Sequence, residues 1–265
     1  MKPECPIERV PTQLAAIVGL LALGLLPGGV QAANGHCAAS SPAHRVAVVE
    51  LYTSEGCSSC PPADRWLSAI RESGLGADQV LPIALHVDYW DYIGWPDRFA
   101  DPRFTRRQRE LAAQNRLNTI YTPQVVLDGR DWRRWWEAAP FLHAIENINA
   151  QKAALDLALA VQWDGDSARV AVTATNGGTL PDRVSVHAGL LESGLASRVT
   201  RGENAGETLA HDHVLRAWLP DLGGPGRSLE GRLTVPADAR PDRLTWVAMA
   251  EGPDGRILQA VSCRF

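Results

Sequence analysis

The stretch ELYTSEGCSSCPPAD, residues 50–64, holds two cysteines three positions apart. The run around its start, residues 46–52, is short, β-branched and mostly apolar, which is typical of a strand buried on both faces. Apolar residues between 63 and 70 recur at helical spacing, and Gly74 ends this predicted helix. The sequence therefore predicts a Cys-x-x-Cys motif at the turn from a buried strand into a helix.

Two thiols at the start of a helix can close a disulfide and exchange it with other thiols. The unpaired amides and the dipole of a helix N-terminus stabilise the thiolate of the first cysteine. We therefore interpret Cys57 as the catalytic nucleophile and the more exposed of the two, and Cys60 as the thiol that resolves the mixed disulfide. Because Pro61 and Pro62 lack amide protons, the regular helix is expected to begin near Pro61, so its dipole acts less directly on Cys57.

Two other roles remain open for this cysteine pair: a permanent structural disulfide, or half of a zinc site. A zinc site needs two further ligands at matched spacing, and the sequence has no second Cys-x-x-Cys. The redox pair is favoured over an inert bridge because the motif lies in the strand–turn–helix context that the thiol chemistry requires.

The pattern up to about residue 152 alternates strand-like and helix-like stretches. Further buried strands are predicted at residues 80–87 and 124–127, the second followed by a hairpin turn at Asp128 and Gly129. Strands separated by helices favour an α/β domain, which we place at residues 33–152, with a partly parallel sheet covered on both faces.

Two further helices are predicted in the same part of the chain. Thr105 and Gln108 have the spacing of a capping box, which places the start of one helix at Thr105 and its end near residue 117. The other helix is expected within residues 135–154.

After about residue 153 the hydrophobic period changes to two. Apolar and mostly polar residues alternate over residues 155–163, as in a half-buried strand. Further strands are predicted at residues 170–175, 184–190, 229–235, 244–250 and 257–263. Short strands with regular turn signals favour an all-β, sandwich-like domain over residues 153–265.

Several motifs together resemble a known family. They are residues 50–64, 86–91 (HVDYWD), 94–95 (GW), 121–124 (YTPQ) and 201–204 (RGEN), with His211. They are similar to the uncharacterised secreted family catalogued as domain of unknown function 1223, which has a thioredoxin-like fold. The resemblance covers nearly the whole mature chain. It implies the thioredoxin-like fold and export, and a redox role by analogy.

Thr122 and Pro123 come just before the third predicted strand, where a proline cannot join a central ladder. In thioredoxin folds a cis-proline loop lies beside the Cys-x-x-Cys and presents backbone to the substrate peptide. The alternative is an ordinary trans turn proline, since cis bonds are uncommon in general. The order of Cys-x-x-Cys, sheet elements and then Thr-Pro-strand favours a cis bond, with Pro123 positioning the substrate and Thr122 supporting it.

The N-terminal residues 1–32 are predicted to be a signal peptide. A weakly basic start precedes an apolar run of about 13 residues, shorter than the roughly 20 that span a bilayer, and small residues precede a cleavage site after Ala32. An uncleaved anchor is the alternative. Export places the mature chain in the periplasm or outside the cell, with no stable membrane insertion after cleavage.

Cleavage also removes Cys5, so Cys37 and Cys263 are left once the redox pair is assigned. Because an oxidising compartment disfavours odd exposed thiols, we expect a structural disulfide between them; two unrelated free thiols are the alternative. This bridge would tie the mature N-terminal segment to the last strand.

Other polar residues are candidates for proton transfer or support. His86 and Asp88, at the end of the second strand, could move protons near the cysteines, although a structural histidine is the commoner case. Glu50 could be a buried carboxylate that accepts the Cys60 proton, or an outward-facing side chain. His211 and His213 are interpreted as loop histidines, because one pair is not a metal site.

Two clusters have simpler interpretations. The arginines between residues 103 and 116 are expected to form a solvated helix face. Trp132, Trp135 and Trp136, with Arg133 and Arg134, could line a peptide groove, but core packing is favoured for tryptophans.

Composition limits the function classes. The chain has 265 residues, 45% of them hydrophobic and 21% charged, with net charge −4, so it is globular and has no basic footprint for nucleic acid. We expect an exported thiol–disulfide oxidoreductase without a cofactor, acting on protein or small thiols and on a redox partner protein. The alternatives are a copper-handling module in which Cys57, Cys60 and His86 hold a soft metal, and a protein-binding module.

Overall fold

A computed structural model describes residues 34–226 and 228–265, so the predicted signal peptide lies outside the described residues. The described chain is rich in strands and has three α-helices. The helices are α1 (Pro61–Ala69), α2 (Pro102–Gln114) and α3 (Ala138–Asn149). No helix in the described ranges has the length and apolar character that crossing a membrane requires.

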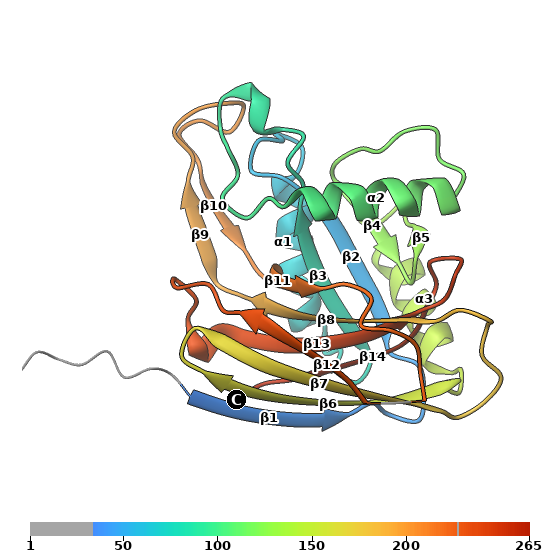
Figure 1. Ribbon diagram of the computed structural model, residues 1–265. Helices are drawn as coiled ribbons and strands as arrows, with labels where there is room; N and C mark the ends of the chain where they lie inside the picture. The colour runs from blue at the N-terminus through green and yellow to red at the C-terminus, as the bar shows by residue number, and fades with distance from the viewer. Residues whose placement is uncertain (1–33, 227) are drawn as a thin grey trace, which may run out of the picture. The chain divides into compact units, whose positions relative to one another are not determined.

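One eight-stranded sheet runs through the molecule (Figure 1). Its strands, in spatial order, are β14 (Ile257–Cys263), β13 (Leu244–Glu251), β8 (Ser185–Glu192), β11 (Val214–Leu219), β3 (Val80–His86), β2 (Ala47–Thr53), β4 (Gln124–Leu127) and β5 (Arg130–Asp131). Strand β3 is parallel to β2 and to β11, and the other neighbours are antiparallel.

The expected fold class, an α/β thioredoxin-like domain followed by an all-β sandwich, is therefore wrong. Four strands from the second half of the chain extend the sheet that the first half begins. The two halves meet where Val214 of β11 pairs with Ala84 of β3, and Ala84 also donates its amide proton to the carbonyl oxygen of His213. Residue alternation could not show this join, because every strand offers the same backbone hydrogen-bonding groups at its edge.

Two smaller sheets complete the fold. The first has the order β1 (Asn34–Ser40), β6 (Leu155–Asp164), β7 (Ser167–Asn176), β12 (Ser228–Thr234), and the second pairs β9 (Leu195–Arg198) with β10 (Thr208–His211). The inward side chains of β6 alternate with exposed ones along the whole strand, as its sequence predicts. They pack against β8, β13 and β14 of the large sheet.

Each face of the large sheet has its own cover. Helix α2 packs Phe104 and Leu111 on one face. On the other face, α1 and α3 cover β2, β3 and β4, and the four-stranded sheet covers β8, β13 and β14. Figure 1 shows this arrangement, with α2 and the four-stranded sheet on opposite sides.

Most local predictions agree with the structure, but the start of α2 differs. The helix begins at Pro102 and its N-cap is Asp101, which accepts a hydrogen bond from the amide of Arg103. Thr105 and Gln108 are buried instead, with their side chains bonded to other segments. A proline at the first helical position and an aspartate before it are also strong start signals, and here they prevail over the capping-box spacing.

Candidate functional site

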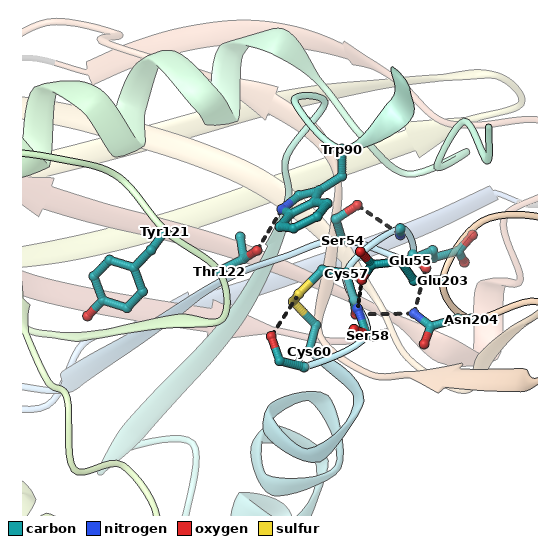
Figure 2. The surroundings of a disulfide bond; sticks show 12 residues. Ser54, Glu55, Cys57, Ser58, Cys60, Trp90, Tyr121, Thr122, Glu203 and Asn204 are labelled. Atoms are coloured by element: carbon teal, nitrogen blue, oxygen red, sulfur yellow. Dashed lines mark hydrogen bonds between the residues drawn. A yellow bond between two sulfur atoms is a disulfide. The ribbon is translucent and has the colours of Figure 1, made fainter. Parts of the chain in front are cut away.

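The Cys57–Cys60 disulfide lies in the turn between β2 and α1 (Figure 2). The Cα atoms of the two cysteines are 5.4 Å apart, and the amide of Cys60 donates to the carbonyl oxygen of Cys57. Helix α1 begins at Pro61 with Cys60 as its N-cap, as expected from the two prolines. The free amides of the helix start therefore lie closer along the chain to Cys60 than to Cys57.

Both cysteines are fully buried, whereas Ser58 and Ser59 between them are exposed. The expectation that Cys57 is the more exposed cysteine is therefore wrong. Trp90 packs against the same turn, since a Cβ atom added at Gly56 would lie 3.0 Å from the Cβ atom of Trp90. A partner has to reach the sulfur of Cys57 past these neighbours.

The loop between β9 and β10 holds the other side of the cysteine turn. Asn204 is buried, and its side-chain amide donates to the carbonyl oxygens of Glu55, at 2.8 Å, and Cys57, at 3.1 Å. The exposed carboxylate of Glu203 accepts a hydrogen bond from the amide of Ser58 at 3.1 Å. Hydrogen bonds from the side chain and the backbone of Ser58 lower the pKa of Glu203. A segment nearly 150 positions away in sequence thus fixes the turn and places a negative charge beside it (Figure 2).

The Thr122–Pro123 loop lies on a further side of the motif, and its peptide bond is cis. The indole nitrogen of Trp90 donates to the hydroxyl of Thr122 at 2.7 Å. Figure 2 shows this hydrogen bond. Because Trp90 also lies against Gly56, it connects the loop with the cysteine turn. Nothing in the backbone hydrogen bonding of residues 34–226 and 228–265 uses the N–H or C=O of Thr122.

Two buried histidine–carboxylate pairs adjoin the turn. His86 Nδ1 lies 2.7 Å from Asp97 Oδ2, and His211 Nε2 lies 3.2 Å from Glu55 Oε1. The two imidazole rings meet edge to face, with centroids 4.9 Å apart. Asp97 also accepts the amide proton of Glu55, which joins both pairs into one cluster.

The protonation of this cluster follows from burial and its hydrogen bonds. Burial opposes the charged form of His86, but Asp97 outweighs it and raises the pKa of His86. Burial would raise the pKa of Asp97, and His86 and two backbone amides lower it overall. In Glu55, burial is likewise outweighed by hydrogen bonds from His211, Ser197 and Trp95, so the pKa of Glu55 is lowered. Asp97 thus favours the protonated form of His86, and His86 favours the ionised form of Asp97.

Asp64 behaves differently, although it belongs to the same region. It lies on α1, one turn after Cys60, and its amide donates to the Cys60 carbonyl oxygen at 3.1 Å. Burial raises the pKa of Asp64, and the nearby His211 and His86 oppose this rise only in part. The raised pKa means that the Asp64 carboxylate takes up a proton more readily than an exposed aspartate does.

Glu50 and Asp88 lie away from the cysteines. Glu50 is buried, but its carboxylate accepts a hydrogen bond from Arg107 at 2.7 Å, on the sheet face that α2 covers. Helix α1 and its motif are on the opposite face, so Glu50 is not placed to accept the Cys60 proton. Asp88 accepts a hydrogen bond from the hydroxyl of Thr105. Arg107 is also the exception to the predicted solvated arginine face, because its side chain is only 12% exposed and forms ion pairs with Glu50 and Glu251.

The geometry does not gather metal ligands. Within the part of the chain that the structure describes, no group of three or more His, Cys, Asp or Glu residues is arranged to hold a metal ion. Cys57, Cys60 and His86 therefore do not form the soft-metal site that the copper alternative requires.

A second disulfide joins Cys37 of β1 to Cys263 of β14. It links the four-stranded sheet to the edge of the large sheet, and both cysteines belong to the apolar core between them. Two disulfides in one chain agree with an oxidising compartment.

Sequence reasoning assigned no role to Glu55, Asp97, Glu203 or Asn204. Residues 201–204 and His211 were among the motifs of the family resemblance, and His211 was interpreted as a loop histidine. In the structure His211 is a buried residue of β10. Nothing in the local pattern around Asp97 signals its partner, because His86 is brought to it by the sheet.

Comparisons with known proteins support the family and the fold. The chain belongs to the family described as protein of unknown function DUF1223, whose model matches residues 48–250. A comparison with curated proteins finds no match.

Two solved structures share the fold. A protein from Agrobacterium tumefaciens is 23% identical, with a TM-score of 0.59 over 83% of this chain and 95% of that chain. HBP35 of Porphyromonas gingivalis is 14% identical, with a TM-score of 0.62 over 85% of this chain and 76% of that chain. At these identities the likeness concerns the fold alone.

Proposed function

We propose that the protein is a thiol–disulfide oxidoreductase that exchanges electrons with protein substrates through Cys57 and Cys60. The observation that carries the proposal is the disulfide at the start of α1, held by the Thr122–Pro123 loop through Trp90 and by Asn204 of the β9–β10 loop. A purely structural bridge between residues three apart removes little chain entropy and has no need of such support.

The exchange runs in two balanced steps. In the reduced protein the Cys57 thiolate attacks one sulfur of a substrate disulfide, the substrate S–S bond breaks, and the released sulfur takes a proton. Cys60 then loses its proton and attacks the Cys57 sulfur, so the Cys57–Cys60 bond forms and the second substrate thiol leaves. Two electrons pass from the protein to the substrate. A substrate dithiol is oxidised by the reverse steps. A redox partner protein then returns Cys57 and Cys60 to their starting state, by reducing them after the first reaction or oxidising them after the second.

The buried cluster supplies the proton chemistry in this proposal. Cys60 is buried, so its proton needs an acceptor inside the protein when it resolves the mixed disulfide. Asp64 lies one helical turn after Cys60, and burial raises its pKa. We assign the Asp64 carboxylate as the proton acceptor in place of Glu50, whose carboxylate is committed to Arg107.

The site of action follows from the same chemistry. Protein thiols and disulfides are the substrates, and the chain works in the periplasm or outside the cell, where disulfides persist. The proposal needs no cofactor, because both electrons are carried by the two sulfur atoms.

The test is an exchange assay with a denatured disulfide protein as substrate and dithiothreitol as reductant. Cys57→Ser is expected to lose turnover by at least about a thousandfold. Cys60→Ser is expected to accumulate a covalent mixed disulfide with the substrate, visible on a non-reducing gel. Wild-type turnover no faster than that of Cys57→Ser would overturn the proposal.

A further inference from the structure

A groove begins beside the disulfide and is lined mostly by aromatic and apolar residues. It has a volume of about 470 Å³, and its lining residues are Ser59, Thr119, Tyr121, Pro123, Val125, Arg133, Trp135 and Trp136. Ser59 stands between the two cysteines, and its hydroxyl oxygen lies 3.4 Å from the Cys57 sulfur. Whatever fills the groove is therefore held next to the sulfur that exchanges.

The outer wall of the groove is an exposed tryptophan. Trp136 is 63% exposed, although tryptophans are highly buried on average. It is nevertheless fixed, because its ring packs against Trp135 at a centroid distance of 5.6 Å, and Trp135 packs against Trp66 of α1 at 5.5 Å. The wall is thus anchored on the helix that follows the cysteines.

The positive charge at the rim of the groove limits which side chains the groove can accept. The guanidinium of Arg133 lies 5.6 Å from the ring centroid of Tyr121, and its Nε is 2.9 Å from Asp131. A planar cation beside aromatic rings favours a further ring stacked on it and disfavours a lysine or arginine. Next to Pro123 of the lining, Thr122 makes no backbone–backbone hydrogen bond within the described residues, so its backbone is available to an extended chain.

We propose that this groove is a specificity site for an extended segment of a protein substrate, and that it takes an aromatic side chain within two or three residues of the substrate cysteine. The inference rests on the proposed function and adds the class of substrate to it. An aromatic ring suits the groove because stacking on fixed tryptophans costs little conformational entropy on either side. Trp136 is the specificity-determining residue, and it takes no part in the sulfur chemistry.

The experiment compares three disulfide substrates with the reduced protein. Two are short peptides, each joined to glutathione through one cysteine and identical except for phenylalanine or alanine two residues after that cysteine. The third is oxidised glutathione, which has no aromatic group. We expect the wild-type rate constant to be about tenfold higher for the phenylalanine peptide than for the alanine peptide, because burial of one aromatic ring stabilises the bound peptide by about that factor.

Trp136→Ser is expected to reduce this preference to less than threefold and to leave the rate with oxidised glutathione unchanged. Tyr92→Ser is the matched control, because Tyr92 is an 83% exposed aromatic residue that does not line the groove. It should keep the tenfold preference. A wild-type protein without the preference, or a Trp136→Ser protein that retains it, overturns the specificity site.

A binding measurement separates this result from a failure of the proposed function. If none of the three disulfide substrates reacts, the oxidoreductase proposal fails, and binding to the groove is then measured by fluorescence anisotropy of the phenylalanine peptide with serine in place of cysteine. Binding to wild type that weakens at least fivefold in Trp136→Ser supports the site. Absence of binding overturns it, as does a concentration-dependent dimer that Trp136→Ser abolishes, because a second copy would then be the occupant.

Discussion

The two disulfides of this chain lie in opposite surroundings. Cys57 and Cys60 are three positions apart, in a turn that adjoins buried histidine–carboxylate pairs and is hydrogen-bonded by the β9–β10 loop. Cys37 and Cys263 are 226 positions apart and join two sheets within an apolar core. A bond between distant residues restricts the unfolded chain strongly, whereas a bond across one turn restricts it little. The Cys37–Cys263 disulfide is therefore suited to stabilising the fold, and the Cys57–Cys60 disulfide to exchange with other thiols.

The largest expected effect is on stability. Replacing Cys37 and Cys263 together by alanine should lower the free energy of unfolding by about 3–5 kcal/mol, because the unfolded chain regains the entropy of a very long loop. The matched double replacement of Cys57 and Cys60 should cost about 2 kcal/mol or less by the same reasoning. Urea denaturation of both variants measures the difference. Equal losses would show that the two bridges do not differ in this way.

A smaller effect is expected on the redox equilibrium. The Glu203 carboxylate beside Ser58 disfavours a thiolate at Cys57 and so favours the oxidised pair. Glu203→Gln keeps a hydrogen-bond acceptor but removes the charge. It should raise the equilibrium constant for reduction by glutathione about two- to fivefold, a modest change because Glu203 is exposed to solvent.

Glu207→Gln is the control for that measurement, since Glu207 is an exposed carboxylate beside the same loop. It should leave the equilibrium constant unchanged. The Glu203→Gln effect should also shrink at 1 M salt, where exposed charges are screened. An effect of the opposite sign would contradict the electrostatic role of Glu203.

The smallest effect is a graded dependence of stability on pH. Asp97 raises the pKa of His86. The contribution of His86 to the free energy of unfolding is therefore fully present below the pKa of about 6.5 that histidine has in the unfolded chain, and it is lost as pH rises through the folded pKa. The pKa of Asp97 is lowered, so its contribution is present above about pH 4 and is lost as pH falls through its folded pKa.

Free energies of unfolding measured from pH 6 to pH 9 test the predicted loss of stability with rising pH. Wild type should lose stability towards pH 9 more steeply than a protein carrying both His86→Gln and Asp97→Asn. His143→Gln removes a histidine whose side chain is 74% exposed and should leave the wild-type slope unchanged. If the free energy of unfolding falls equally steeply with pH in all three proteins, the buried His86–Asp97 pair does not cause the loss of stability at alkaline pH.

Local patterns predicted much of this molecule. The strands around residues 46–52, 80–87 and 155–163 agree with β2, β3 and β6, because side-chain periodicity reports burial directly. The helix start at Pro61 follows from two prolines that cannot donate amide protons. β1, β5, β9, β10 and β11 were not predicted, since none has a strong periodic signal and β5, β9 and β10 have four residues or fewer.

The sequence by itself thus determined the local elements and the position of the cysteine motif between a strand and a helix. Only the tertiary structure decided that β11 lies beside β3, which makes one sheet of two expected units. It also brought Asn204 to Cys57, 147 positions away, and buried both cysteines of the motif. The physical reason is that periodicity and turn preferences act within a few residues. Which strand edges pair, and which loop covers a turn, depend instead on backbone groups that are alike in every residue and on packing between distant segments.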